Sequence, residues 1–359
     1  MHIFLFLLVG ILFSSASFAN PLLGLPPLLI PEDNIQTIDK VKLGQLLFND
    51  VRFSSTNSIS CASCHDNNKA FTDGRKVAKG VNDLTGLRNA PTVVNAAFYK
   101  TYFLDGREPS LEAQSLGPFL NPVEHGLQDF KKILSVIRST QNYHQMFEQA
   151  FDVSVDKITI DHVAKAIASF ERTLIAGNSS FDQYYFGRDH TKLSESAARG
   201  LRIFRRKGNC ANCHEVSFDN ALFMDNRFYN IGIGFNRLKP KLNEIILSLE
   251  EGKTVEEIDI SPEQHSELGR FNATHIISDI GKFKTPTLRN ISLTAPYMHD
   301  GSMNTLQEVV DYYNKGGDQN RFMDPAIFPL HLTKQEKNDL VEFMKSLTSS
   351  QFLSNKKMD

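Results

Sequence analysis

The chain of 359 residues contains no tryptophan and only four cysteines, and its 39 basic residues nearly balance its 41 acidic ones. A formal net charge of −2 argues against a nucleic-acid partner and does not favour a charged membrane surface. Alternating apolar patterns typical of strands are sparse, so the fold is predicted to be mainly α. A length of 359 residues is sufficient for two domains, each with its own core.

The four cysteines all belong to two C-x-x-C-H pentapeptides, at 61–65 and 210–214, so none is left for a disulfide. This is the attachment motif of c-type haem: two thiols bond to the porphyrin, and the next histidine becomes the proximal iron ligand. A redox C-x-x-C needs no following histidine, and a zinc site usually places its histidine further along the chain. The motifs therefore predict two covalent haems, with Cys61, Cys64, Cys210 and Cys213 as attachment points and His65 and His214 as iron ligands.

The first nineteen residues read as a secretory signal. An apolar run covers 3–13, and small residues at Ser17 and Ala19 precede a cleavage site before Asn20. An uncleaved anchor is the alternative, but the run is short for a membrane span. Cleavage would leave a periplasmic protein with no stable membrane span, which agrees with c-type haem being attached outside the cytoplasm.

Helices are predicted at 32–48, 110–116, 129–151, 161–175, 194–206 and 333–347, with a further helix opening at the capping box of Thr305 and Glu308. Residues 242–249 form a short amphipathic pattern that is predicted to be a surface insertion. A Gly-x-x-(Leu or Ile)-Phe pattern precedes both haem motifs, at 44–48 and 200–204, and forms a weak internal repeat. The predicted architecture is two cytochrome c-like haem domains in tandem, at 20–185 and 186–359.

Segments around these motifs resemble the bacterial di-haem cytochrome c peroxidase family, and within it the MauG-like branch. The matching segments, in the family's order, are 89–95 (NAPTVVN), 104–107 (LDGR), 114–124 (QSLGPFLNPVE), 283–290 (FKTPTLRN) and 294–301 (TAPYMHDG). The resemblance implies an N-terminal haem that meets hydrogen peroxide, a C-terminal haem that handles electrons, and a calcium ion between the two domains.

At the first haem, the resemblance implies that Glu124 is the catalytic glutamate and that Gln114 and Pro118 lie in the distal pocket. Conventional members close this iron with a second histidine, but no histidine occurs between His65 and His125, and Val81 stands near the expected position. The first iron is therefore expected to be five-coordinate or to bind only water. His125 is interpreted as packing against the pocket, with tuning of the glutamate as the alternative.

At the second haem, the position of the family's methionine ligand is occupied by Tyr313, as the resemblance implies for MauG-like proteins. A phenolate oxygen would favour high oxidation states of iron. Tyr313 also lies on an apolar helix face and could be a core tyrosine, and Met298 and Met303 are rival ligands.

The family's bridging tryptophan aligns with Leu104, so charge sharing between the haems must either take another route, for example past Tyr102 or Phe103, or be weaker. For calcium, the resemblance points to the side chain of Asn89 and to the backbone carbonyls of Thr294 and Pro296. Oxygen ligands of this kind suit a hard cation.

The sequence thus predicts a periplasmic, MauG-like di-haem peroxidase that uses hydrogen peroxide and high-valent iron to oxidise an electron donor or a protein partner. One alternative is a conventional cytochrome c peroxidase that removes peroxide with a small cytochrome or cupredoxin as donor. The other is a di-haem electron-transfer protein without enzymatic activity. Whether the chain forms a homodimer is left open.

Overall fold

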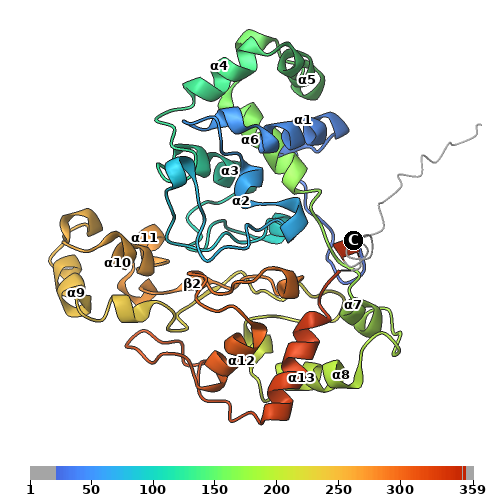
Figure 1. Cartoon of the computed structure of the whole chain (residues 1–359), viewed down its shortest axis with the longest axis vertical. Helices are drawn as coiled ribbons and strands as arrows, with labels where there is room; N and C mark the ends of the chain where they lie inside the picture. The colour runs from blue at the N-terminus through green and yellow to red at the C-terminus, as the bar shows by residue number, and fades with distance from the viewer. Residues whose placement is uncertain (1–21, 350, 353–359) are drawn as a thin grey trace, which may run out of the picture.

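The computed structural model describes residues 22–349 and 351–352, and the predicted signal sequence at 1–19 lies outside them. Figure 1 shows two helical halves stacked one above the other, with a smaller lobe to one side. Within the described residues the only strands are the antiparallel pair β1 (Phe228–Tyr229) and β2 (Phe283–Lys284). The prediction of a mainly α fold is confirmed.

The first half contains α1 to α6: α1 (Ile38–Asn49), α2 (Cys61–Cys64), α3 (Leu111–Leu120), α4 (Lys131–Ser139), α5 (Gln141–Phe151) and α6 (Ile160–Glu171). Its core is one cluster of buried apolar side chains, among them Phe48, Phe53, Phe119 and Ile167. Helix α1 packs along α6, and α3 packs against the same helix. Helix α6 is therefore the central element of this half.

The second half contains α7 (Ser180–Tyr185), α8 (Glu195–Arg205), α12 (Leu306–Asn314) and α13 (Lys334–Lys345) around a separate apolar cluster. Phe181 of α7 is fully buried in this second cluster, so α7 contributes to the second core although it precedes the proposed boundary at 185. The division into 20–185 and 186–359 stays a proposal.

The side lobe contains α9 (Leu242–Glu250), α10 (Pro262–Glu267) and α11 (Phe271–Thr274) (Figure 1). Residues 242–249 do form a helix, as predicted. The helix is not a lone surface insertion, because Ile245 and Ile246 pack with Phe235 and Phe271 in a third apolar cluster.

The internal repeat corresponds to the same packing in both halves. Gly44 of α1 lies so close to α6 that an added methyl group would overlap the carbonyl oxygen of Ala166, and Gly200 of α8 stands in the same relation to Asp339 of α13. The spacing shared by the two copies places Phe48 and Phe204 one turn after the glycine, and both are buried. The pattern Gly-x-x-(Leu or Ile)-Phe thus marks a close crossing of two helices in front of each haem motif.

Two of the predicted helices have different bounds. The pattern at 129–151 forms two helices, because Thr140 adopts extended dihedral angles and its hydroxyl donates to the carbonyl of Val136. The helix predicted from 32 begins at Ile38, where Thr37 caps the backbone N–H of Lys40, after a short 3₁₀ turn.

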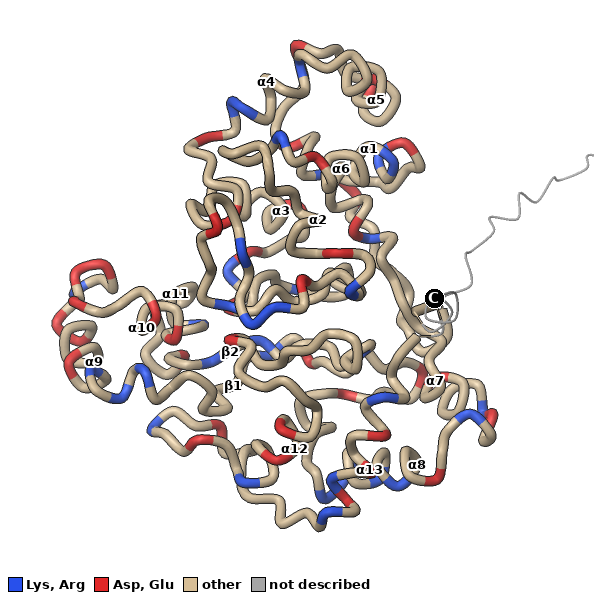
Figure 2. The backbone as a smooth tube through the Cα atoms, in the orientation of Figure 1, with Lys and Arg blue, Asp and Glu red and all other residues tan. Residues whose placement is uncertain are grey.

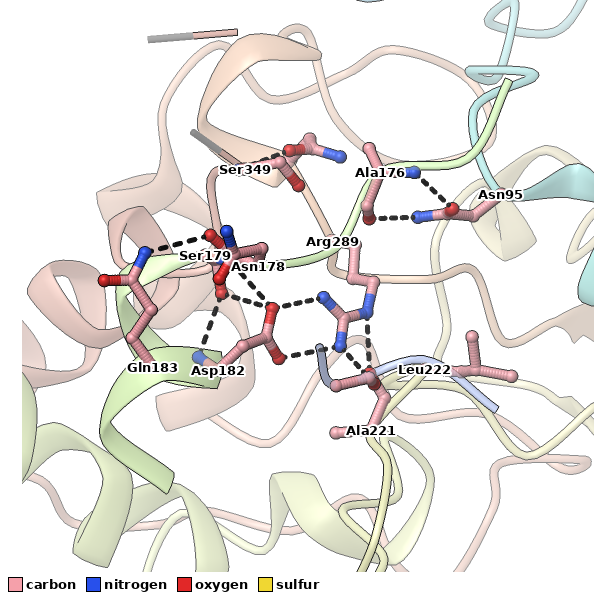
Figure 3. A network of polar contacts seen from close by, with 12 residues as sticks. Asn95, Ala176, Asn178, Ser179, Asp182, Gln183, Ala221, Leu222, Arg289 and Ser349 are labelled. Atoms are coloured by element: carbon pink, nitrogen blue, oxygen red, sulfur yellow. Dashed lines mark hydrogen bonds and ion pairs between the residues drawn. The ribbon is translucent and has the colours of Figure 1, made fainter. Parts of the chain in front are cut away.

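A buried ion pair joins segments that are distant in the sequence (Figure 3). The Arg289 guanidinium donates to both carboxylate oxygens of Asp182, at 2.8 and 2.9 Å, and neither side chain is exposed to solvent. Arg289 also donates to the carbonyl oxygens of Gly24 and Ala221, and Ser179 donates to Asp182 at the start of α7. The pair holds together the segment around Gly24, helix α7 and the loop after the second haem motif.

Lys and Arg alternate with Asp and Glu over both halves, as Figure 2 shows, in keeping with the near-zero net charge. None of the helices in the described part of the chain combines the length and the apolar character that a membrane crossing requires.

Candidate functional site: two cavities at the C-x-x-C-H motifs

The first cavity brings the first haem motif together with three residues predicted to act in catalysis. Its lining residues are Ile59, Ser60, Cys61, Cys64, His65, Val93, Gln114, Ser115, Pro118, Glu124, His125, Ile167 and Glu171. Three separate parts of the first half therefore meet in one place: the motif, helix α3 with the turn after it, and helix α6.

Helix α3 supplies Gln114, Ser115 and Pro118 because positions i, i+1 and i+4 share one helix face. Ser110 caps the helix by accepting from the backbone N–H of Ala113 at 3.1 Å. Pro118 has no N–H to donate to the carbonyl of Gln114, so the ladder of backbone hydrogen bonds is interrupted on the cavity side.

The orientation of Glu124 is fixed by Asn121, the residue directly after α3. The Asn121 amide donates to Glu124 Oε1 at 2.7 Å, and its side-chain oxygen accepts from the backbone N–H of Val123 at 2.9 Å. Burial raises the pKa of the Glu124 carboxyl above its usual value, and the positive charge of Arg107 offsets part of this rise. The carboxyl is therefore fixed in position and more basic than a glutamate in water.

Glu171 is a second carboxyl in this cavity, and one of its oxygens has no hydrogen-bond partner among the described residues. Glu171 is 4% exposed, its Oε2 atom is buried, and among the described residues no group donates to that atom. Burial raises the pKa of Glu171 to about 8, although Arg172 acts against the rise. At neutral pH this side chain is mostly a protonated acid.

His65 has the orientation expected of an iron ligand. Its Nδ1 donates to the carbonyl oxygen of Phe71 at 3.1 Å, since a carbonyl can only accept, and this fixes the tautomer that leaves the Nε2 lone pair free. His214 in the second half repeats the arrangement with the carbonyl of Phe223, at 2.8 Å.

Val81, near the position where conventional members have a second histidine, and His125, expected to pack against the pocket, both form hydrogen bonds with backbone groups. His125 is 3% exposed, its Nδ1 donates to the carbonyl oxygen of Phe53 at 2.9 Å, and its ring packs edge-on against Phe119. Val81 is buried, and its N–H donates to the carbonyl oxygens of Val123 and Glu124. Of the described residues that line the first cavity, only His65 and His125 are histidines.

The second cavity surrounds the second haem motif and extends to the boundary between the halves. Cys210, Cys213, His214, Tyr313 and Met298 line it together with apolar side chains of α8, α12 and α13. Met303 is not among its lining residues and packs against the second apolar cluster.

Tyr313 differs from its neighbour Tyr312, which is a core tyrosine. Tyr312 is buried and its hydroxyl donates to the carbonyl oxygen of Ile231 at 2.8 Å. Tyr313 lines the cavity instead, and within the described chain its hydroxyl has no hydrogen-bond partner. Burial raises the pKa of Tyr313 well above its usual value in the absence of iron, so a phenolate would form only with a cation beside it.

The residues named for the bridging position and for calcium lie where the halves meet. Leu104 lines the second cavity, and its carbonyl accepts from the N–H of Lys284 at 2.8 Å. Asn89, Thr294 and Pro296 line the same cavity. The Asn89 amide donates to the carbonyl oxygen of Arg75 at 2.7 Å, and among the described residues its Oδ1 accepts no hydrogen bond.

The donor sets fit two haems. Each cavity offers two thiols one helical turn apart and a histidine whose Nδ1 is occupied and whose Nε2 is free. In the described chain no three His, Cys, Asp or Glu side chains cluster as a purely protein-made metal site would require. Two thiols and one histidine in each cavity are the groups that a covalently attached haem requires.

A family model described as di-haem cytochrome c peroxidase matches residues 38–190. The chain is also 33% identical over 344 residues to a cytochrome-c peroxidase, IdrP1, of Pseudomonas sp. (strain SCT), covering 94% of this chain and 88% of that protein. The chain therefore belongs to the di-haem cytochrome c peroxidase family. It is a di-haem peroxidase, an oxidoreductase with hydrogen peroxide as acceptor.

Further relatives lie in the MauG-like branch. The methylamine utilization protein MauG of Methylorubrum extorquens is 32% identical over 317 residues, covering 88% of this chain and 80% of that protein. The crystal structure of a MauG-like protein associated with microbial copper homeostasis matches with a TM-score of 0.76 and 30% identity, covering 94% of this chain and 97% of that chain. The di-haem peroxidase BthA of Burkholderia thailandensis shares the fold, with a TM-score of 0.70 at 22% identity over 89% of this chain and 88% of that one. The predicted family and enzyme class are confirmed.

The sequence did not indicate that Asn121 would contact Glu124 or that Glu171 would lie in the first cavity. The Asn-Pro pair at 121–122 is a turn signal that could have indicated an amide able to orient a neighbour. No local signal marks Glu171, because its burial results from contacts with distant segments.

Proposed function

We propose that this chain is a MauG-like di-haem peroxidase whose first iron is open in the resting, oxidised protein and needs no prior reduction. It uses hydrogen peroxide to oxidise an electron donor or a partner protein through high-valent iron. The observation that carries the proposal is the first cavity, where Glu124 shares a space with His65. The only other histidine among its described lining residues, His125, is held aside by its bond to the carbonyl of Phe53 and by its contact with the Phe119 ring.

When bound, the first haem supplies the iron at which peroxide is reduced. Glu124 then takes the proton from one peroxide oxygen and returns it to the other, so that the leaving oxygen departs as water. Asn121 holds the carboxylate in place for this transfer. Glu171 keeps its proton at neutral pH, which avoids a second negative charge beside the first.

The cofactor arrangement follows the donor sets. We propose covalent attachment through Cys61 and Cys64 and through Cys210 and Cys213, with His65 as the protein ligand of the first iron and His214 and Tyr313 as ligands of the second. The unpartnered hydroxyl of Tyr313 in the second cavity supports this choice over Met298.

A calcium ion is proposed at the boundary between the halves, held by the Asn89 side chain and the carbonyl oxygens of Thr294 and Pro296. The free Oδ1 of Asn89 supports it. The partner is proposed to be a periplasmic protein, in keeping with the export signal predicted at 1–19. Homodimer formation stays open.

An EPR spectrum of the oxidised holoprotein as isolated tests the proposal. The expected spectrum has a high-spin ferric component from the first haem and a low-spin component from the second. Two low-spin haems in the oxidised protein, with a high-spin signal only after half-reduction, would favour the conventional cytochrome c peroxidase. Two low-spin haems in every redox state would leave an electron-transfer protein.

Tyr313→Phe is expected to abolish the low-spin signature of the second haem, because phenylalanine has no oxygen to offer the iron. Met298→Leu is the matched control from the same cavity and is expected to leave the spectrum unchanged. EPR and optical spectra of the two ferric variants provide the measurement, and the reverse pattern would assign the ligand to Met298.

A further inference from the structure

Lys284, at the end of β2, is a buried cation without a counter-ion. It is 7% exposed, and among the described residues that line the second cavity it is the only lysine or arginine, with no aspartate or glutamate beside it. In the described chain no carboxylate lies within ion-pair distance of its amine. Asp105, whose charge acts on the amine from further away, is already paired with Arg88 and Arg107, at 3.0 and 2.7 Å.

The surroundings of the Lys284 amine satisfy it only in part. Nζ donates to the carbonyl oxygen of Thr101 at 2.7 Å and lies 3.9 Å from the centre of the Tyr99 ring and 5.8 Å from that of Tyr102. An ammonium group has three donors, and among the described residues only the carbonyl of Thr101 accepts a hydrogen bond from it, while the two ring faces offer weaker cation–π contacts. Burial lowers the pKa of Lys284 to about 7, and the attraction of Asp105 does not compensate for it.

A buried charge is stable only when it is paired and hydrogen-bonded. No described residue offers Lys284 an acid within ion-pair distance, so an anion bound in the cavity would supply the missing partner and keep the amine charged. The cavity is lined by Cys210 and Cys213, and the haem attached there carries two propionate groups on its edge. The first cavity has the opposite character, because its described lining contains two carboxyls, Glu124 and Glu171, and no lysine or arginine.

We propose that Lys284 is the cation that binds a propionate of the haem attached at Cys210 and Cys213. This inference rests on the proposed covalent haem of the second half, but not on its reaction with peroxide. Binding would complete the donor set of the amine. It would also fasten the boundary between the halves, because the N–H and Nζ of Lys284 both donate to carbonyl oxygens of the 101–104 segment.

The electrostatic consequence is specific to one haem. Oxidation of iron adds one positive charge to the haem, and a cation paired with its propionate disfavours that addition. Lys284 should therefore raise the reduction potential of the second haem and leave that of the first unchanged.

Lys284→Met and Lys284→Gln in the di-haem holoprotein test this role, with Lys284→Arg as the charge-retaining control. Spectroelectrochemical titration is expected to show a lower potential for the second haem in the Met and Gln variants, no shift for the first haem, and a value near wild type for the Arg variant. Resonance Raman spectra should show displaced propionate bending bands in the Met and Gln variants only. The Gln variant keeps a donor for the carbonyl of Thr101, so it carries the test if the Met variant does not accumulate as di-haem protein.

An unchanged second-haem potential with unchanged propionate bands would overturn the assignment. An equal shift of both haems would overturn it as well, because it would indicate a general loosening of the boundary between the halves. No peroxide is used in these measurements. A protein that fails to react with peroxide would refute the proposed function and leave the result for Lys284 intact.

Discussion

Glu124→Gln is expected to slow the reaction of the oxidised protein with peroxide by about 10²–10⁴-fold, the usual contribution of a positioned acid–base group. Glutamine has nearly the same shape and can keep the contact with Asn121, which joins the Asn121 amide to Glu124 Oε1 at 2.7 Å. It cannot accept and return a proton. Stopped-flow absorption after mixing with peroxide gives the rate, and the resting spectrum checks that the haems are unperturbed.

The control for this variant is Glu148→Gln, an exposed glutamate on α5 far from both haem motifs, and its rate should equal that of the wild type. The pH profile adds a second check. The base must be deprotonated, so the wild-type rate should fall as the pH drops through the raised pKa of Glu124, and this acid limb should vanish in Glu124→Gln. A Glu124→Gln rate within about twofold of wild type would exclude the carboxylate as the base, since it would correspond to a loss far below the range for such groups.

Asp182→Asn is expected to lower the free energy of unfolding by about 3–5 kcal/mol, because it leaves the Arg289 charge buried without a partner. Both side chains of the pair have no exposed surface, and the guanidinium joins three segments of the chain (Figure 3). Unfolding of the holoprotein with guanidinium chloride, monitored by far-UV circular dichroism, measures the change in the free energy of unfolding.

The matched control is Lys345→Met, which breaks the exposed ion pair with Glu342 at the end of α13. Exposed pairs contribute about 0–1 kcal/mol, so this variant should unfold close to wild type. Equal effects of the two variants would mean that Arg289 finds another partner or water when Asp182 is neutralised, and that the pair does not hold the segments together.

Much of the fold could be predicted because its signals are local. Ser194 and the Thr305–Glu308 capping box open α8 and α12 at the predicted residues. The repeated glycine could be found from spacing alone, although its reason, a close helix crossing, became clear only from the packing against Ala166 and Asp339. The break at Thr140 was missed because a β-branched residue inside an amphipathic pattern is compatible with a continuous helix.

The candidate site was predictable only in part. The C-x-x-C-H motifs specify their own chemistry, and the family resemblance supplied Glu124, Gln114 and Pro118, which the fold brings into one cavity. The raised pKa of Glu171 and the lowered pKa of Lys284 both result from burial by segments far away in the sequence. A glutamate or lysine met in a sequence is usually exposed, so no pattern distinguishes these two from the others.

The account depends most directly on an open first iron that faces Glu124. The decisive measurement mixes oxidised holoprotein with hydrogen peroxide, without any prior reduction, and follows the optical spectrum. We predict a prompt spectral change of the haem at Cys61 and Cys64 that survives long enough to be recorded. A spectrum that stays unchanged until one haem has been reduced would contradict the account.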